Sequence, residues 1–539
     1  MRSISSDDPV AASRALVAAL RASLEARQGG PVRLVETHIS GVLLTETLAY
    51  KLKKPVRLPF VDFTSLAARR HFCAEELRLN RRLAPSLYLE VAEVRDSADG
   101  PVFGGEGPLL EVAVKMRRFA DGALWSERLA AGALVPHDVD RLAQRLVDFH
   151  RDGAVAPADS DFGSPALHER VTRRLIAGID AWAHGDSAAA TTAAADWPAL
   201  RAWLDEQLRV LAPLFEARRR DGRVRECHGD LHLHNLLQLE GEATAFDGIE
   251  FDPELRWIDV LDDIAFVAMD LMAHGAGDLA FRFLNAYLEA CGDYAGIPAL
   301  RFHLVGRALV RAQVAAIAEA QGQPRRAAVA TADYLALALR LARRTDARLA
   351  ITRGLPGSGK SFVSQALLEA AGAFRVRSDV ERKRLFGLAP LQSSRDCVAG
   401  GIYDGASTVR TYACLRELAR VVLGAGWPVI VDAALLRADE RAGFAALAEE
   451  LGVAFAIFDC QAPLALLRER VALREARGGD PSEADVAVLE RLAAAAEPLG
   501  DGERAVTIAI DSAEPLSPVA LAERWRAVNG RRGPEFPSG

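Results

Sequence analysis

The octapeptide GLPGSGKS at residues 354–361 constrains the fold of this chain more than any other stretch. It matches the pattern G-x-x-x-x-G-K-[ST], follows the strand-like run ARLAIT and opens a helical stretch, which is the context that the pattern requires. Its glycines let backbone N–H groups point at phosphate oxygens, its lysine reaches the same phosphates, and its serine hydroxyl is a ligand for Mg²⁺. The alternative interpretation is a plain glycine turn in front of a helix. The residues that we expect to bind a nucleotide are Gly354, Leu355, Pro356, Gly357, Ser358, Gly359, Lys360 and Ser361.

The sequence around this octapeptide alternates between strand and helix. The strand-like runs are ARLAIT, FRVRS, PVIVDAA, AFAIFDC and AVTIAID, and helical stretches separate them. Five short apolar strands in alternation with helices predict a parallel sheet with helices on its faces. We therefore expect an α/β domain with a parallel five-stranded sheet at residues 346–528 and a disordered tail at residues 529–539.

Two aspartates close strands of this predicted sheet. Asp379 follows FRVRS and Asp432 ends PVIVD, and ligands of open parallel sheets bind beyond the carboxyl ends of the strands. We expect Asp432 to hold Mg²⁺ or its water shell. We expect Asp379 to take the proton of an acceptor hydroxyl, with Arg382 holding a phosphate or the acceptor. A helix N-cap is the alternative role for either aspartate.

Arginines at helical spacing precede the turn GGDPSEAD. Arg470, Arg474 and Arg477 lie at i, i+4 and i+7, so they share one helix face. A mobile lid that carries arginines stabilises charge on a transferring phosphoryl group and excludes water. We expect Arg470 and Arg474 to bind the nucleotide, and a solvated basic face is the alternative.

Residues 347–515 resemble the small P-loop kinases of the polynucleotide kinase, zeta-toxin and gluconate kinase type. The resemblance rests on GLPGSGKS, SDVER, VIVDAAL and the arginine-rich segment, and it covers about a third of the chain. It implies ATP as the phosphoryl donor, Asp379 as the general base and Arg382 as a contact to phosphate or substrate. It leaves the acceptor open, and it disfavours a hexameric AAA-type motor.

A second polar cluster lies in the stretch ECHGDLHLHNLL at residues 226–237. His228 and His232 have the spacing of a zinc pair on a helix, but a zinc site needs about four ligands and no second cluster is evident. A polar surface turn is another alternative. The third interpretation is the arrangement H-x-D-x-x-x-x-N of a phosphotransfer loop.

In this third interpretation, Asp230 accepts the proton of the acceptor hydroxyl and Asn235 is a ligand for Mg²⁺. A further carboxylate has to follow on a short hairpin to bind the metal of the nucleotide. Asp247, in the run ATAFDGIEF, has this position.

The strand-rich stretch at residues 32–116 contains the lysines that such a site needs. Lys51, in the run LAYK, and Lys53 point the same way from a predicted strand. The next helix supplies Glu75 and Glu76 as ion-pair partners, and we prefer Glu75. We expect Asp262 to support the loop that carries the histidines.

Residues 30–345 resemble the aminoglycoside phosphotransferase branch of the protein-kinase-like fold, on the motifs CHGDLHLHN, FDGIE and LAYK. The resemblance implies an α+β bilobal domain in which Asp230 is the catalytic base, Asn235 and Asp247 bind Mg²⁺, and Lys51 holds the phosphates of ATP. One motif departs from the family, because ETHISG stands where a glycine-rich loop would precede LAYK. A nucleotide-binding regulatory module without catalytic activity therefore stays open.

The whole chain resembles bacterial fused proteins with a phosphotransferase-like domain ahead of a P-loop kinase. We expect an N-terminal helix at residues 1–29, the two kinase-type domains at 30–345 and 346–528, ATP and Mg²⁺ as cofactors, and a small-molecule hydroxyl acceptor. The net charge of −7 and the pI of about 6.0 disfavour a nucleic-acid partner, and a nucleic-acid 5′-hydroxyl kinase is the alternative. The N-terminus lacks an apolar signal and no run of about 18 apolar residues occurs, so we expect a cytoplasmic protein.

Overall fold

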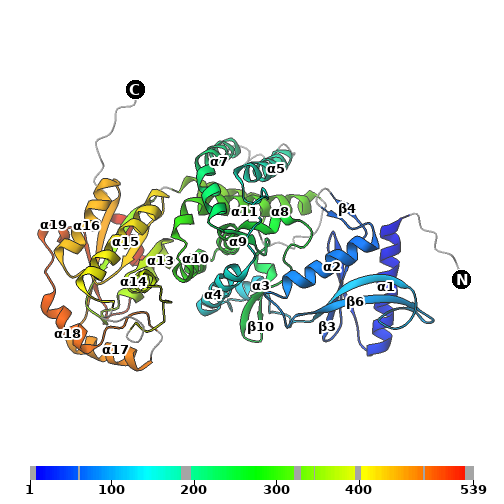
Figure 1. The fold of residues 1–539 in the computed structure, drawn as a ribbon, viewed down its shortest axis with the longest axis horizontal. Coiled ribbons are helices and arrows are strands. Elements are labelled where there is room, and N and C mark those ends of the chain that lie inside the picture. The colour runs from blue at the N-terminus through cyan, green and yellow to red at the C-terminus, as the bar shows by residue number, and fades with distance from the viewer. Residues whose placement is uncertain are drawn as a thin grey trace. The chain divides into compact units, whose positions relative to one another are not determined.

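The computed structural model describes residues 8–58, 61–183, 196–320, 329–344, 346–394, 402–477 and 480–528. The chain forms two compact units (Figure 1). The first unit comprises residues 1–168 and 215–267, and the second comprises residues 169–214 and 268–539. The predicted disordered tail at residues 529–539 lies outside the described residues. The predicted domain boundary between residues 345 and 346 stays a prediction, because compactness does not show which segment folds by itself.

The first unit is built on a six-stranded antiparallel sheet, in the order β1-β2-β3-β8-β6-β7. Helix α1 begins after the cap Asp8, and helix α2 begins after the cap Ser65. These elements and the short pair β4–β5 are α1 (Pro9–Gln28), β1 (Arg33–Glu36), β2 (Ser40–Leu44), β3 (Leu48–Lys53), β4 (Arg57–Leu58), β5 (Val61–Asp62), α2 (Leu66–Asn80), β6 (Tyr88–Ser97), β7 (Gly100–Phe103) and β8 (Leu109–Arg117).

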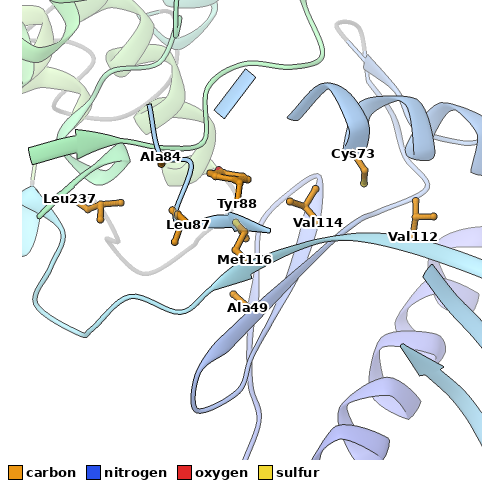
Figure 2. Close-up of a cluster of buried hydrophobic side chains, with 9 residues drawn as sticks. All are labelled: Ala49, Cys73, Ala84, Leu87, Tyr88, Val112, Val114, Met116 and Leu237. Carbon is orange, nitrogen blue, oxygen red and sulfur yellow. The ribbon is translucent and has the colours of Figure 1, made fainter. Parts of the chain in front are cut away.

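Both faces of this sheet are covered, because alternate residues of its strands point to opposite sides. Val112, Val114 and Met116 of β8 pack with Cys73 of α2 on one face, in the cluster that Figure 2 shows. Ala113, between them in sequence, belongs to a second buried cluster, with residues of α1. The sheet therefore lies between α1 and α2, and α2 can direct polar side chains toward β3.

The rest of the first unit consists of helices and two short pairs of strands. Strand β9 pairs with β12, and β10 pairs with β11, both antiparallel. The elements are α3 (Trp125–Ala130), α4 (Pro136–Asp152), β9 (Val224–Glu226), η1 (Leu233–Asn235), β10 (Leu236–Leu239), β11 (Glu242–Ala245), α8 (Pro253–Arg256) and β12 (Trp257–Asp259). Helices α5 (Pro165–Ala183), α7 (Trp197–Arg220) and α9 (Val260–Ala273) each contribute residues to both compact units.

The second unit contains a five-stranded parallel sheet, in the order β14-β15-β13-β16-β17. Its central strands β13, β15 and β16 are mostly buried and apolar, as the sequence predicts for a sheet covered on both faces. The edge strand β14 carries two arginines, and the edge strand β17 alternates between buried and more exposed residues. The elements are β13 (Arg348–Arg353), α13 (Lys360–Ala371), β14 (Phe374–Arg377), α14 (Ser378–Leu385), α15 (Gly405–Gly424), β15 (Val429–Asp432), α16 (Ala438–Glu450), β16 (Ala454–Gln461), α17 (Leu464–Arg477), α18 (Val486–Ala495), α19 (Asp501–Arg504), β17 (Thr507–Asp511) and α20 (Pro518–Ala527).

Four further elements of the second unit precede this sheet in sequence. They are α10 (Gly277–Cys291), η2 (Tyr294–Gly296), α11 (Ile297–Ala320) and α12 (Thr331–Arg343). Helix α10 packs against α13 and β14, and α11 packs against α15 (Figure 1). The predicted fold class is confirmed: an antiparallel sheet and a helical region are followed by a parallel five-stranded P-loop domain. Among the described helices, none is long and apolar enough to cross a membrane.

Candidate functional sites

The phosphate-binding loop connects β13 to α13, as the sequence predicts, and its backbone accepts only glycine at two points. Gly354 has φ of +152° and Gly357 has φ of +80°. A Cβ atom would lie 2.5 Å from the Cys460 carbonyl oxygen at position 354 and 2.9 Å from the Leu467 carbonyl oxygen at position 357. The loop therefore wraps more tightly than any residue with a side chain allows.

A cavity of about 900 Å³ opens beside this loop. Lys360 is held by a 2.9 Å hydrogen bond from its Nζ to the carbonyl oxygen of Leu355. Burial lowers the pKa of Lys360, and the carboxylates of Asp432 and Asp379 oppose that shift. Among the described residues, no carboxylate forms an ion pair with this lysine. The predicted site residues that line the cavity are Pro356, Lys360, Ser361, Asp379, Arg382, Asp432 and Arg474.

The two predicted aspartates lie at the carboxyl ends of neighbouring strands. Asp432 is the last residue of β15, and Ser364 Oγ donates a 3.0 Å hydrogen bond to its Oδ2. Arg377 Nε lies 3.7 Å from the same oxygen. Asp379 is in the first turn of α14, whose N-cap is Arg377. Neither aspartate is a helix N-cap, since the N-cap of the helix after β15 is Arg437.

Arg382 follows Asp379 by three residues, so the two share a face of α14. Its Nη1 donates to the carbonyl oxygen of Ile402 at 3.1 Å and to Thr408 Oγ1 at 3.2 Å, and its guanidinium lies 5.1 Å from the ring centroid of Tyr403. Its Nε is buried and finds no acceptor among the described residues. Arg382 therefore brings a cation to the cavity wall next to Asp379.

The two predicted lid arginines have different contacts. Arg470 Nη1 donates to Ser512 Oγ at 2.8 Å and to the Gly357 carbonyl oxygen at 3.3 Å, which ties α17 to the phosphate-binding loop. Arg474 donates to the Ala484 carbonyl oxygen at 2.7 Å and lines the cavity. The binding of nucleotide by both arginines stays a prediction.

In the first unit, Lys51 contacts two carboxylates. Its Nζ lies 2.9 Å from Glu76 Oε1 and forms a second ion pair with Asp247. Burial by itself would lower the pKa of Lys51, but Asp247, Glu76 and Glu250 outweigh it and raise the pKa well above the ordinary value. Lys53 shares Glu76, at 2.7 Å from Oε2, and pairs with Glu250.

The preference for Glu75 as the partner of Lys51 is therefore wrong. Glu76 is fully buried and faces the sheet, whereas Glu75 points outward and pairs with Arg78 at 2.8 Å. Successive residues of a helix point about 100° apart, so the packing of α2 on the sheet decides which of two adjacent carboxylates meets the lysine.

The loop between β9 and β10 gathers the predicted phosphotransfer residues. Asn235 Nδ2 donates to Asp230 at its carbonyl oxygen, 3.0 Å away, and at its Oδ2, 2.9 Å away. His232 Nε2 lies 3.3 Å from the same carboxylate. Asp247 has a left-handed φ of +62°, and its backbone N–H donates to the hydroxyl of Tyr88 at 3.0 Å. These contacts fix the side chains that the sequence assigns to proton and metal binding.

The residue that supports this loop is Asp263, and the expected Asp262 is wrong by one position. The fully buried Asp263 accepts backbone hydrogen bonds from His228 at 3.0 Å and Gly229 at 2.8 Å. Its Oδ2 also lies 3.0 Å from His150 Nε2. Burial would raise the pKa of Asp263, but these hydrogen bonds and the neighbouring histidines lower it.

The histidines of this loop do not form a zinc cluster within the described part of the chain. His228 Nε2 bonds to the Phe246 carbonyl oxygen at 2.9 Å, and its Nδ1 accepts from the backbone of Asp230 at 3.2 Å. Burial lowers the pKa of His228. His228 therefore ties the loop to Phe246, the residue before Asp247.

A closed turn takes the place of the glycine-rich loop in the first unit. Thr37 N–H donates to the Ser40 carbonyl oxygen at 2.8 Å, and the two hydroxyls lie 2.8 Å apart. Lys54 Nζ adds a 2.7 Å hydrogen bond to the Thr37 carbonyl oxygen. The polar groups of Thr37 and Ser40 therefore bond mainly to each other, and few backbone N–H groups of the turn remain for a phosphate.

Comparisons with known proteins extend this picture. A family model described as AAA domain matches residues 349–499. Uncharacterized proteins of Mycobacterium tuberculosis and Mycobacterium bovis are each 31% identical over 485 residues, which cover 89% of this chain and 92% of theirs. A gluconokinase from Sinorhizobium meliloti 1021 is 22% identical, covers 34% of this chain and 92% of its own, and gives a TM-score of 0.24. A choline/ethanolamine kinase family protein from Mesorhizobium loti is 14% identical, covers 62% and 99%, and gives a TM-score of 0.34.

Proposed function

This chain belongs to the same family as the two mycobacterial proteins, and we propose that it is an ATP- and Mg²⁺-dependent phosphotransferase that acts on hydroxyl acceptors. The proposal places one kinase-type site in each compact unit. Catalysis in both sites comes mainly from positioning and from neutralisation of charge on the transferring phosphoryl group.

One observation carries the proposal for the second unit: the residues that line a single cavity include Lys360, Ser361, the carboxylates Asp379 and Asp432, and the arginines Arg382 and Arg474. The loop backbone and Lys360 would hold the phosphates of ATP, and Ser361 and Asp432 would hold Mg²⁺. The bound Mg²⁺ neutralises phosphate charge. Lys360 forms no ion pair with a described carboxylate. A buried cation of this kind favours an anionic ligand, because the ligand supplies the missing counter-charge.

The acceptor hydroxyl of this site loses its proton to Asp379. A carboxylate at the cavity wall can accept this proton in the transition state. Arg382, on the same face of α14, holds an anionic group of the acceptor or of the donor. The volume of about 900 Å³ accommodates a nucleotide together with a small acceptor.

In the first unit, Asp230 would accept the proton of the acceptor hydroxyl, and Asn235 and Asp247 would hold Mg²⁺. Lys51 would hold the phosphates of ATP after exchanging its contact with Asp247. The closed turn at Thr37–Ser40 and the Lys51–Asp247 ion pair also favour a second candidate function for this unit. In that candidate, the first unit binds nucleotide and regulates the second without transferring phosphate.

Turnover of ATP with a panel of acceptors separates these possibilities. The panel contains sugars, aminoglycosides, nucleosides and 5′-hydroxyl oligonucleotides, and the proteins are the wild type, Lys360→Ala and Asp230→Ala. We expect each variant to lose a different activity. If Lys360→Ala abolishes all turnover and Asp230→Ala changes nothing, the first unit is regulatory; turnover that neither variant lowers contradicts the proposed function.

A further inference from the structure

Strand β14 lies at the edge of the parallel sheet, and helix α10 completes that edge. Asn285 Nδ2 donates to the Ala373 carbonyl oxygen at 2.9 Å, and the Arg375 N–H donates to Asn285 Oδ1 at 2.7 Å. The Tyr294 hydroxyl donates to the Arg375 carbonyl oxygen at 3.4 Å. The free backbone groups of an edge strand need partners, so α10 and η2 take the place of a neighbouring strand.

One turn further along α10, Glu289 binds the side chains of two arginines that β14 presents. Its Oε1 lies 2.8 Å from Arg377 Nη1, and its Oε2 lies 3.1 Å from Arg375 Nη2. Burial would raise the pKa of Glu289, but the two guanidinium groups outweigh it and lower the pKa. The Glu289 carboxylate therefore lies between two guanidinium groups, of which that of Arg375 is buried and that of Arg377 is largely buried.

Both arginines also contact residues of the P-loop site. Arg375 Nη1 donates to Ser364 Oγ at 3.3 Å and to the Ser361 carbonyl oxygen at 3.4 Å. Ser364 Oγ donates in turn to Asp432, which Arg377 Nε approaches to 3.7 Å. Glu289 is thus connected to the candidate P-loop site through two arginines. Arg375 leads to the helix that follows the loop, and Arg377 leads to Asp432.

We propose that Glu289 is a positioning residue of the P-loop site, which keeps the 3.7 Å contact of Arg377 with Asp432 from closing to a hydrogen bond and so keeps the Asp432 carboxylate available for Mg²⁺. This inference rests on the metal-binding role proposed above for Asp432. It assigns to the second unit a functional side chain that stands about 70 residues before the phosphate-binding loop in sequence. The P-loop site is then incomplete without helix α10.

The charges around Arg377 explain why Glu289 has this effect. A buried guanidinium requires a counter-charge, and the described carboxylates that pair with Arg377 are Glu289 and Asp432. When Glu289 loses its charge, Asp432 is the remaining ion-pair partner, and the 3.7 Å contact shortens to a hydrogen-bonded ion pair. An arginine bound to Asp432 competes with Mg²⁺ for the same oxygens.

The experiment measures how much Mg²⁺ tightens the binding of a fluorescent ADP analogue, mant-ADP, to the full-length protein. Lys360→Ala identifies the share of binding that belongs to the P-loop site. Glu289→Gln removes the charge and keeps the size of the side chain. Glu369→Gln is the matched control, because Glu369 joins α13 to α10 through a 2.7 Å contact with Arg282 and has no described contact with Asp432.

We expect Glu289→Gln to reduce the gain in affinity from Mg²⁺ by about tenfold, the size of one charge-assisted contact, and to leave binding without Mg²⁺ within about twofold. Glu369→Gln should keep the whole gain. Equal effects of the two variants would reduce Glu289 to a docking contact and overturn the inference. If Lys360→Ala removes none of the Mg²⁺-dependent binding of mant-ADP that the wild type shows, the proposed function of the P-loop site is contradicted instead.

A second variant keeps the inference testable if Glu289→Gln does not fold. Arg377→Met removes the competing cation, so it should retain or increase the gain from Mg²⁺, and the double variant with Glu289→Gln should bind like Arg377→Met alone. Such a cycle isolates the coupling between the two residues. Loss of the gain in Arg377→Met would show that Arg377 itself supports the metal site, and would overturn the inference.

Discussion

The two candidate sites of this chain treat their lysines in opposite ways. In the second unit, Lys360 is held by a carbonyl oxygen and faces a cavity with its charge unneutralised by any described ion pair. In the first unit, Lys51 and Lys53 share the buried carboxylate of Glu76, and Lys51 also pairs with Asp247.

This difference indicates two ways of preparing a phosphate site. A cation held by neutral carbonyls is ready to bind an anion, because the ligand supplies the missing counter-charge. A cation that already has carboxylate partners must exchange at least one of them before it binds phosphate. The second site is organised in advance, whereas the first requires a rearrangement that Mg²⁺ at Asp247 would favour, since the metal would compensate the lost lysine contact.

The largest expected effect tests the proton acceptor of the prepared site. Asp379→Asn removes the base, so kcat of the Lys360-dependent activity should fall by about 10² to 10⁴-fold, while the affinity for mant-ADP should change little. Steady-state kinetics and fluorescence titration check both. Asp439→Asn, in an exposed aspartate of α16, is the control and should retain activity. A kcat for Asp379→Asn near that of the control would remove Asp379 from the chemistry.

A comparably large effect on stability should come from the paired site. Burial would raise the pKa of Glu76, but Lys51 and Lys53 lower it from the ordinary 4.5 to about 2. Removing one partner of a buried ion pair costs about 3 to 5 kcal/mol. We expect the lower end for Glu76→Gln, because the lysines keep Asp247 and Glu250. Urea unfolding with hydrogen–deuterium exchange of residues 33–117 measures the first unit separately.

The pH dependence of this loss has a definite sign. Because folding lowers the pKa of Glu76, its contribution is fully present above pH of about 4.5 and is lost as the pH falls toward 2. The difference between wild type and Glu76→Gln should therefore shrink below pH 4.5. Glu75→Gln is the control on the neighbouring residue, whose partner Arg78 is about half exposed, and should cost less than about 1 kcal/mol. Equal losses of unfolding free energy in Glu76→Gln and Glu75→Gln would contradict the result that only Glu76 is buried.

A smaller effect should distinguish the two sites without any metal. Pyrophosphate supplies the charge that the P-loop site lacks, so calorimetry should detect its binding to the full-length protein in the absence of Mg²⁺. Lys360→Ala should weaken this binding by about ten- to a hundredfold, the worth of a charged hydrogen bond. Lys115→Met, at an exposed lysine, should leave it unchanged. Binding that survives Lys360→Ala would mean that the paired lysines of the first unit also accept phosphate.

Only six of the 66 lysine and arginine residues of the chain are lysine. The smallest expected effect concerns why the chain retains lysine at two positions to which we assign no role in binding. Lys115 forms a surface pair with Glu90 at 2.7 Å, so Lys115→Arg should change stability by less than about 0.5 kcal/mol. Lys383 is buried and pairs with Glu483 at 3.1 Å. Lys383→Arg should cost about 1 to 3 kcal/mol through overpacking. Thermal unfolding of both variants checks this, and equal costs would make the retention of Lys383 a matter of chance.

The errors of the sequence-based analysis share one physical origin. Glu75 in place of Glu76, and Asp262 in place of Asp263, are errors of one residue on helices whose position in sequence was correct. Sequence places a carboxylate on a helix, but the helix must rotate against its neighbour before one of two adjacent residues is selected. In α2, Cys73, Glu76 and Asn80 are buried at intervals of three and four residues, and this spacing selects Glu76. Helix α9 is buried on nearly every side, so its apolar pattern does not select Asp263.

Local sequence patterns were enough to predict the strands of the parallel sheet and the glycine-rich loop. The five strands of the parallel sheet follow from short runs rich in apolar residues, and the phosphate-binding loop follows from glycines that no other residue can replace. The gathering of Asp379 and Asp432 at one cavity follows from the rule that parallel strands end at the same edge of a sheet.

The tertiary structure alone decided which charges neutralise one another. The pairing of Lys51 with Asp247 and the contact of Glu289 with Arg375 and Arg377 join residues that are far apart in sequence. No periodicity or motif encodes such pairs, because an ion pair depends on distances of a few ångströms that exist only after the helices have packed. The sequence therefore determined where the candidate phosphate-binding lysines lie, and the tertiary structure determined which of them already has carboxylate partners.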